Sequence, residues 1–313
     1  MKAVVRHRYG PPDVLAIEET DTPAPRDGEV LIKVHAASVN PMDWHFMRGE
    51  PKLIRMFTGP RRPRDPRIGV DVAGRVEAVG GKVTRFKPGD EVFGACRGAF
   101  AEYACTKEKA LAIKPANVTF AQAGATTVAA LTALQSLRKG GIRSGQKVLI
   151  NGASGGVGTF AVQMAKAFGA EVTGVCSTRN LELVRALGAD YVVDYTRDNF
   201  TTSGQRYDLM IDCVASQPLS KVRRILAPNG VCMLVGSAEG RFLGPMVYAL
   251  FVPRFKAAMA KSKQADLDTI ADLMARGKVT PAIDKVYPLS EAADAVRHLE
   301  TGHARGKVVI AIA

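Results

Sequence analysis

Hydrophobic and polar positions follow two different patterns along the chain, and the change falls near residue 120. The first third consists of short apolar segments separated by glycine and proline, among them 30–36, 69–79 and 91–94. Such segments are typical of the strands of a small barrel or sandwich. The stretch 49–68 lacks this pattern, contains four prolines and is rich in basic residues, so we expect an extended loop there.

Beyond this point, apolar strands alternate with helical segments. We expect strands at 147–151, 171–176, 191–194, 209–213 and 231–235. Helices are expected at 121–137, 157–168, 181–187 and 218–226. Strands that are almost continuously apolar and joined by helices form parallel sheets covered on both faces, so this part predicts a doubly wound parallel sheet. The tail breaks the alternation, with helices at 265–275 and 290–300, an extended segment at 281–287 and a strand at 307–311.

A glycine-rich loop follows the strand at 147–151 and precedes a helix. Gly152, Gly155 and Gly158 form a G-x-x-G-x-x-G pattern, which reads A-x-G-x-x-G from Ala153. Backbone without Cβ lets a pyrophosphate approach closely, and the helix that follows directs its free N–H groups at the anion. This context favours a dinucleotide site over a merely structural tight turn. The residues predicted to hold the pyrophosphate are Gly152, Ser154, Gly155, Gly156 and Val157.

The end of the next strand indicates which dinucleotide is bound. NAD sites usually place a carboxylate there for the ribose 2′-hydroxyl. This strand is instead followed by Ser177, Thr178 and Arg179, which offer hydroxyls and a guanidinium. Such groups suit a 2′-phosphate, so we expect the cofactor NADPH. The alternative is that Ser177 only caps the next helix and Arg179 is solvated.

Several segments then match one family in the expected order. They are 37–43 (ASVNPMD), 69–76 (GVDVAGRV), 87–94 (KPGDEVFG), 151–158 (NGASGGVG) and 306–309 (GKVV). Together they resemble the zinc-independent medium-chain dehydrogenase/reductases of the quinone oxidoreductase-like branch. The resemblance implies a chaperonin-10-like β-domain over 1–120, completed by 277–313, and a Rossmann NADPH-binding domain over 121–276. It also implies reduction of quinones or of the C=C bond of α,β-unsaturated carbonyls, and relatives that are often homodimers.

The resemblance assigns further cofactor contacts. Thr127 resembles a threonine near the nicotinamide ribose, Tyr195 one beside the adenosine phosphate, and Lys307 a lysine near the cofactor phosphates. Apart from the resemblance, Val235, Gly236 and Ser237 lie at the C-terminal end of a strand, where the switch-point rule places the nicotinamide.

The same comparison bears on metal and catalysis. Zinc-dependent relatives carry a cysteine where Asn40 stands and a histidine where Val70 stands, so we expect no metal. Asn40 is the first catalytic candidate, able to bond the nicotinamide ribose or a carbonyl. Asp43 and His45 are the others, as a polar wall or a proton relay. The alternative is that Asn40 only pins a turn before Pro41 and that His45 is exposed.

Charge leaves a second function open. The chain carries a formal charge of +13, and seven basic residues fall between Arg48 and Arg67 against two acidic ones. A surplus of this kind suits a phosphate cofactor, a nucleic acid or a membrane face. The alternative function is therefore a non-catalytic NADPH-binding protein that contacts nucleic acid or an anionic surface through this stretch. The stretch lacks interleaved aromatic residues, so we do not expect a nucleic-acid partner.

Composition gives the expected location. No apolar run approaches the roughly 18–20 residues of a membrane span, and Arg6, His7 and Arg8 interrupt any secretory signal. The five cysteines form no C-x-x-C pair, which fits a reducing compartment. We expect a cytoplasmic protein with no membrane partner.

Overall fold

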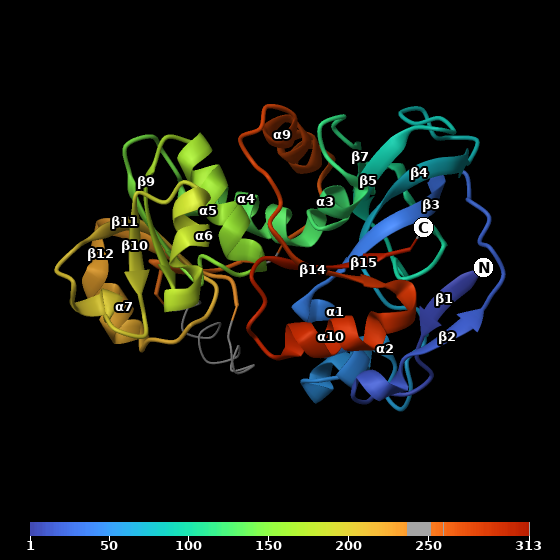
Figure 1. The fold of residues 1–313 in the computed structure, drawn as a ribbon, viewed down its shortest axis with the longest axis horizontal. Coiled ribbons are helices and arrows are strands. Elements are labelled where there is room, and N and C mark those ends of the chain that lie inside the picture. Colours follow the sequence, from blue (N-terminus) through green and yellow to red (C-terminus); the bar gives the residue numbers. More distant parts are fainter. Residues whose placement is uncertain (237–251, 259, 313) are drawn as a thin grey trace. The chain divides into compact units, whose positions relative to one another are not determined.

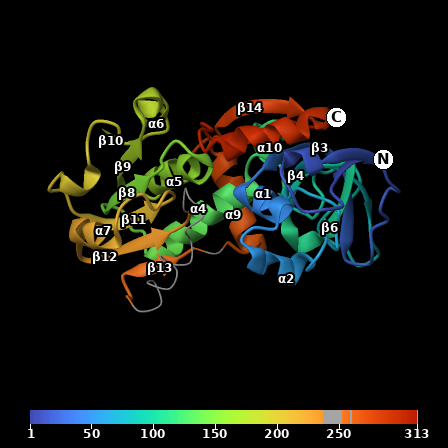
Figure 2. The ribbon, with the colours of Figure 1, turned by 90° about the horizontal axis from the view of Figure 1, so that it is seen from below.

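The computed structural model describes residues 1–236, 252–258 and 260–312, and the chain forms two compact units (Figures 1 and 2). The first unit comprises Met1–Val128, Ser262–Ala275 and Pro281–Ala313, and the second comprises Ala129–Lys261 and Arg276–Thr280. The units differ from the domains expected from the sequence mainly in Ser262–Ala275, which belongs to the first unit and not to 121–276.

The second unit is built on a parallel sheet of six strands. Their order is β10-β9-β8-β11-β12-β13, so the chain runs outward from β8 in one direction and then from β11 in the other. The strands are β8 (Lys147–Asn151), β9 (Glu171–Cys176), β10 (Tyr191–Asp194), β11 (Tyr207–Asp212), β12 (Leu226–Leu234) and β13 (Phe255–Ala257). This order, 3-2-1-4-5-6 in chain sequence, is that of the Rossmann fold, and it places a switch point between β8 and β11.

Helices cover both faces of this sheet. On one face, Gly174 of β9 packs against Val184 of α6 (Leu181–Ala186), and Gly140 at the end of α4 (Thr127–Gly140) packs against Leu209 of β11. On the other face, apolar residues of α7 (Leu219–Ile225) join Leu149 of β8 in one buried cluster. Helix α5 (Gly156–Ala167) contacts β8 and β9. The doubly wound sheet expected from the sequence is therefore present.

The first unit is built on a mostly antiparallel sheet. The order of its main path is β14-β15-β3-β4-β5-β7, and β6 also pairs with β3. The strands are β3 (Glu29–Val39), β4 (Asp71–Val79), β5 (Glu91–Ala95), β6 (Tyr103–Lys107), β7 (Leu111–Ile113), β14 (Ile283–Pro288) and β15 (Lys307–Ala311); β1 (Lys2–Val5) and β2 (Ala16–Glu19) form a separate pair. Because β15 pairs with β3, the end of the chain completes the sheet that its beginning starts. The unit also contains helices α9 (Gln264–Ala275) and α10 (Ala292–Glu300).

The single helix expected over 121–137 is wrong in one respect: the chain forms two helices, α3 (Phe120–Gly124) and α4. The break has two local causes. Thr126 Oγ1 donates to the Gln122 carbonyl at 2.7 Å, which takes up one of the last acceptors of α3. The N–H group of Val128, in the first turn of α4, donates to Asp71 Oδ1 at 2.8 Å, so a distant carboxylate caps the new helix.

The expectation of an extended loop over 49–68 is also partly wrong. The 3-10 turn η2 (Lys52–Ile54) leads directly into helix α2 (Arg55–Thr58). Thr58 Oγ1 donates to the Ile54 carbonyl at 3.1 Å, and Arg55 Nε donates to the Gly49 carbonyl at 3.0 Å. These side-chain bonds stabilise a helical turn that the flanking prolines conceal in the sequence.

Within the described ranges, no helix combines the length and hydropathy needed to cross a lipid bilayer.

Candidate functional site

The glycine-rich loop connects β8 to α5 in the second unit. Gly155 is the N-cap residue and Gly156 begins the helix, so the unpaired N–H groups of its first turn lie at this loop. These groups carry the positive end of the helix dipole and attract an anion. The loop therefore has the electrostatics that a pyrophosphate requires.

Two glycines of this loop serve different purposes. A Cβ added to Gly158 would lie 2.0 Å from the Gly152 carbonyl oxygen and 2.8 Å from the Ala153 Cα, so only glycine fits there. A Cβ added to Gly155 would meet only the Gly152 carbonyl oxygen, at 3.4 Å, an ordinary van der Waals distance. Packing within the described chain thus requires Gly158 and does not require Gly155. The cradle that a side chain at 155 would fill fits a dinucleotide pyrophosphate.

Asn180 links two serines that the sequence predicts to hold the cofactor. Its Nδ2 group donates to Ser154 Oγ at 3.0 Å and to Ser177 Oγ at 3.2 Å. Both hydroxyls accept in these bonds, so each keeps its own proton for a phosphate oxygen. Asn180 is buried, and its Oδ1 has no hydrogen-bond partner in the described chain. Asn180 therefore positions both serines.

The residues expected at the 2′-phosphate differ in what they can donate. Thr178 Oγ1 donates to Asp194 Oδ2 at 2.5 Å, and this bond is the main cause that lowers the pKa of Asp194. Because Thr178 spends its only proton there, it cannot also donate to a phosphate. Arg179 is exposed, and Tyr195 lies exposed directly after β10. Ser177 and Arg179 are thus the donors that this strand end offers to a 2′-phosphate.

Strands β8 and β11 end side by side at the switch point. Asn151 Nδ2 donates to Asp212 Oδ1 at 2.8 Å, and burial raises the pKa of Asp212. The N–H groups of Val235 and Gly236 donate to the Asp212 carbonyl at 2.9 and 3.4 Å. Both residues therefore lie at the carboxyl edge of the sheet, where ligands of doubly wound folds bind. Ser237, predicted with them, lies outside the described residues.

A buried polar cluster in the first unit is centred on Asp71 of β4. Asp71 Oδ2 accepts from Ser38 Oγ at 2.7 Å and from Asn40 Nδ2 at 3.0 Å. It also accepts from Lys307 Nζ of β15 at 3.2 Å. All four side chains are buried. A charged pair this deep is tolerated because each member is hydrogen-bonded.

Asn40 has little hydrogen-bonding capacity left. Its Nδ2 group donates to Asp71 and to the Ser38 carbonyl at 3.3 Å, so both N–H groups are used. Its Oδ1 accepts from Lys307 Nζ at 2.5 Å, which leaves one lone pair. Asn40 can therefore accept one bond from a ligand hydroxyl but cannot donate to a carbonyl. Of its two expected roles, a bond to a ribose hydroxyl is possible, because the hydroxyl can donate to Asn40 Oδ1, whereas a bond to a carbonyl is not.

Lys307 lies in this cluster, in the first unit, whereas the glycine loop belongs to the second. Its Nζ donates to Asn40, to Asp71 and, at 3.4 Å, to the Val39 carbonyl. An ammonium whose three N–H groups all have protein partners holds Asn40 in place. Its expected role near the cofactor phosphates stays a prediction.

Asp43 fixes the backbone at Asn40. Asn40 is the N-cap of α1 (Pro41–Arg48), and Asp43 Oδ2 accepts its N–H group at 2.7 Å. This contact is the N3 half of a capping box. Burial raises the pKa of Asp43 to about 7, and the hydrogen bond from Asn40 opposes that shift. With 1 % of its surface exposed, Asp43 acts through Asn40 as a positioning residue.

His45 and Thr127 offer different groups. His45 stacks on Trp44 with ring centroids 3.7 Å apart, and its Nδ1 donates to the Glu50 carbonyl at 2.8 Å. Burial lowers the pKa of His45, which favours the neutral ring.

Thr127 is fully buried at the start of α4, and its Oγ1 has no hydrogen-bond partner among the described residues. A buried hydroxyl without a partner is the feature expected of a residue that bonds a ligand.

Asp71, Asn180 and Asp212 take part in these contacts, although none of them is predicted from the sequence as a site residue. A signal exists for the two carboxylates, because Asp71 stands among apolar strand residues and Asp212 ends an apolar strand. A carboxylate at such a position needs polar partners. Asn180 stands in a polar segment, where no sequence signal distinguishes its amide from the neighbouring polar side chains.

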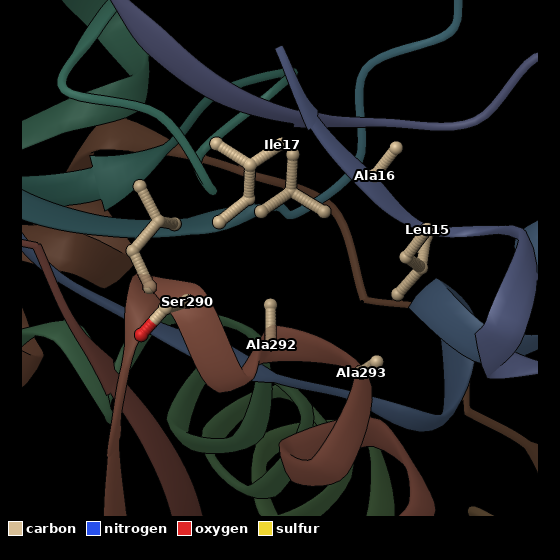
Figure 3. A pocket seen from close by; sticks show the side chains of 8 residues that line it. Leu15, Ala16, Ile17, Ser290, Ala292 and Ala293 are labelled. Carbon is tan, nitrogen blue, oxygen red and sulfur yellow. The ribbon is translucent and has the colours of Figure 1, made fainter.

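A separate pocket of about 270 Å³ lies in the first unit. Figure 3 shows Leu15, Ala16 and Ile17 on one side of the pocket and Ser290, Ala292 and Ala293 on the opposite side. It is lined by Val4, Leu15, Ala16, Ile17, Leu289, Ser290, Ala292 and Ala293. These residues include no titratable side chain and no predicted site residue, so the pocket offers no group for proton transfer.

The Rossmann sheet, the glycine loop and the antiparallel unit define a two-domain nucleotide-dependent oxidoreductase. Residues 26–116 match the alcohol dehydrogenase GroES-like domain, and residues 187–310 match the zinc-binding dehydrogenase family.

Relatives extend this match over nearly the whole chain. A 2-methylene-furan-3-one reductase of Solanum lycopersicum is 37 % identical, over 99 % of this chain and 79 % of its own length. A chloroplastic NADPH-dependent alkenal/one oxidoreductase of Arabidopsis thaliana is 36 % identical over the same shares. The solved quinone oxidoreductase of Coxiella burnetii has a TM-score of 0.90 and 31 % identity, covering 100 % of this chain and 99 % of its own.

The chain therefore belongs to the medium-chain dehydrogenase/reductase family, in its quinone oxidoreductase-like branch, and is an oxidoreductase. The expected fold class, a chaperonin-10-like (GroES-like) β-domain with a Rossmann sheet, is confirmed.

Proposed function

We propose that the protein reduces quinones or the C=C bond of α,β-unsaturated carbonyls with NADPH and without zinc. The observation that carries this proposal is the buried bond between Lys307 Nζ and Asn40 Oδ1. It lies at the position that the family resemblance assigns to a metal-binding cysteine.

The residue types at this position support chemistry without zinc. The ammonium of Lys307 lies 2.5 Å from the Asn40 oxygen and would repel a dication bound at that oxygen. Val70 offers no ligand atom in its side chain. Among the described residues, no three His, Cys, Asp or Glu side chains gather as a metal site requires.

NADPH fits the residues of the second unit. The α5 N-terminus and the cradle at Gly155 suit its pyrophosphate. Ser177 and Arg179 supply donors for its 2′-phosphate, and the name of the Arabidopsis relative includes NADPH dependence. When bound, NADPH supplies two electrons and a proton as hydride.

A conjugated acceptor suits the residues of the first unit. Quinones and enones contain their own electron sink, so the protein needs to orient them and to admit one proton. Asn40, fixed by Asp43 and Lys307, accepts one hydroxyl such as that of the nicotinamide ribose. Thr127 offers a hydroxyl that has no hydrogen-bond partner among the described residues. The expected cytoplasmic location and a homodimer stay predictions.

The decisive experiment follows NADPH oxidation by the purified protein with quinones, enones and aldehydes, together with metal analysis of the same sample. We expect turnover of quinones or enones that persists with a zinc chelator. Asn40→Ala should lower kcat/KM about 10- to 100-fold because the ligand loses its fixed contact.

The matched control is Asn117→Ala, which removes an amide of the same unit that donates to the Met274 carbonyl. It should leave kcat/KM unchanged. Zinc-dependent alcohol oxidation, or no turnover of any conjugated acceptor, would contradict the proposal.

A further inference from the structure

Residues 52–64 of the first unit, the basic–apolar segment, present apolar side chains to solvent. Leu53, Met56 and Phe57 are 59, 67 and 78 % exposed. They belong to η2 and α2, and α2 lies at the rim of its unit in both views (Figures 1 and 2). Single exposed apolar residues are common, whereas three within a short segment form a patch that calls for a partner.

The same segment carries cations without acidic partners. Lys52, Arg61, Arg62 and Arg64 are exposed, and within the described ranges none of them forms an ion pair. The protein uses the other basic residues of this stretch internally. Arg48 pairs with Glu300 at 2.6 Å, Arg55 donates to the Gly49 carbonyl, and Arg67 pairs with Asp65 at 2.9 Å.

The backbone of the segment is anchored from inside. The Tyr9 hydroxyl donates to the Gly59 carbonyl at 2.7 Å, and the Arg64 N–H donates to the Thr58 carbonyl at 2.8 Å. Gly59 and Pro63 are buried. The exposed side chains therefore project from a fixed support, which lowers the entropic cost of binding.

We propose that the basic–apolar segment docks the protein on an anionic phospholipid surface. Leu53, Met56 and Phe57 enter the boundary between headgroups and acyl chains, and the four cations contact the lipid phosphates. This proposal departs from the expectation of no membrane partner and concerns peripheral binding only.

Other occupants fit this chemistry less well. A symmetric contact with a second copy would bring the same uncompensated cations together. A single-stranded nucleic acid would find one aromatic ring, Phe57, where stacking needs several. An anionic lipid surface satisfies the cations and the apolar side chains at once.

Sedimentation with lipid vesicles tests the proposal. At physiological ionic strength, the full chain should bind phosphatidylcholine vesicles that contain phosphatidylglycerol and should not bind pure phosphatidylcholine. The triple variant Arg61→Glu, Arg62→Glu, Arg64→Glu should bind about 100-fold more weakly, since each lost cation costs about fivefold. Met56→Ser with Phe57→Ser should weaken binding about tenfold or more.

The matched control reverses three exposed cations of α7, with Lys221→Glu, Arg223→Glu and Arg224→Glu. It makes the same change in net charge without neighbouring exposed apolar residues, and we expect it to bind within about threefold of the wild type. Thermal unfolding and NADPH oxidation with a water-soluble quinone should be unchanged in all variants.

Three results would overturn the proposal. The first is that the full chain binds neutral and anionic vesicles equally, or binds neither. The second is that the α7 control loses as much vesicle binding as the Arg61/Arg62/Arg64 variant. The third is that the Met56/Phe57 variant shows a raised KM for the soluble quinone while its vesicle binding is intact. The last result would place the segment in an acceptor site.

Discussion

At the scale of single residues, unused hydrogen-bonding capacity decides what a side chain can do. Asn40 is a predicted site residue, yet its amide N–H groups are both used inside the protein. Thr178 is predicted to hold the 2′-phosphate, yet its hydroxyl donates to Asp194. By contrast, Ser154 and Ser177 accept from Asn180 and keep their own protons. Sequence motifs therefore predict which residues form a site. The hydrogen bonds that each of these residues already makes within the protein determine which of them can still donate to a ligand.

Replacing Arg179 tests the 2′-phosphate assignment. Arg179→Ala should raise the KM for NADPH about 10- to 100-fold, because a charge-assisted bond to phosphate is lost. The KM for NADH should stay within about twofold, since that cofactor has no 2′-phosphate. Steady-state kinetics with both cofactors measures the difference.

Arg185→Ala provides the comparison for Arg179→Ala, because Arg185 is an exposed arginine that pairs with Glu182. It should change neither constant. Equal effects of Arg179→Ala on both cofactors would disprove the assignment.

Asp43 makes stability depend on pH. Its folded-state pKa of about 7 lies above the ordinary value of 3.8, so between these values the folded state holds one proton more than the unfolded state. The stability that Asp43 contributes is therefore complete below about pH 4 and is lost as the pH rises to about 7. Asp43→Asn keeps an acceptor for the Asn40 N–H and removes this titration.

Denaturant unfolding of both proteins across this range measures the effect. The free energy of unfolding of Asp43→Asn, relative to wild type, should rise by about 1.4 kcal/mol per pH unit. A difference that does not change with pH would show that Asp43 has an ordinary pKa.

At the scale of elements, tertiary contacts decide where helices begin. The apolar pattern over 121–137 suits one helix. A second helix begins there because Asp71 of β4 accepts the N–H group of Val128 and caps the first turn of α4. Helix α2 likewise depends on bonds from Arg55 and Thr58. Strands β8, β9, β10 and β11 lie within about two residues of their expected places because their buried apolar runs are local signals. Strand β12 begins at Leu226, before the expected 231–235, and β13 was not predicted.

The glycine loop provides a prediction at this scale. Gly155→Val should abolish NADPH binding by filling the pyrophosphate cradle, with little change in melting temperature, because the added Cβ meets only ordinary contacts. Gly158→Val should unfold or strongly destabilise the protein, because its Cβ would lie 2.0 Å from the Gly152 carbonyl oxygen. Fluorescence titration with NADPH and thermal unfolding separate the two effects. Intact NADPH affinity in Gly155→Val would refute the cradle.

At the scale of the whole molecule, the formal charge of +13 has more than one use. Some cations complete the fold, as Lys307 does at Asp71 and Arg48 at Glu300. Arg179 is exposed at the end of β9, where a phosphate is expected. Lys52, Arg61, Arg62 and Arg64 of the basic–apolar segment form no ion pair with the described residues, so their charge is available to an external surface.

The sequence by itself determined the parallel sheet, the dinucleotide loop and the family, because strand periodicity and glycine spacing are local properties of the chain. Only the tertiary structure decided that Asp71, Asn40 and Lys307 form one buried cluster, since these residues are far apart in sequence and meet through the pairing of β4, β3 and β15. It also decided that Leu53, Met56 and Phe57 face solvent, because burial depends on what the rest of the chain covers.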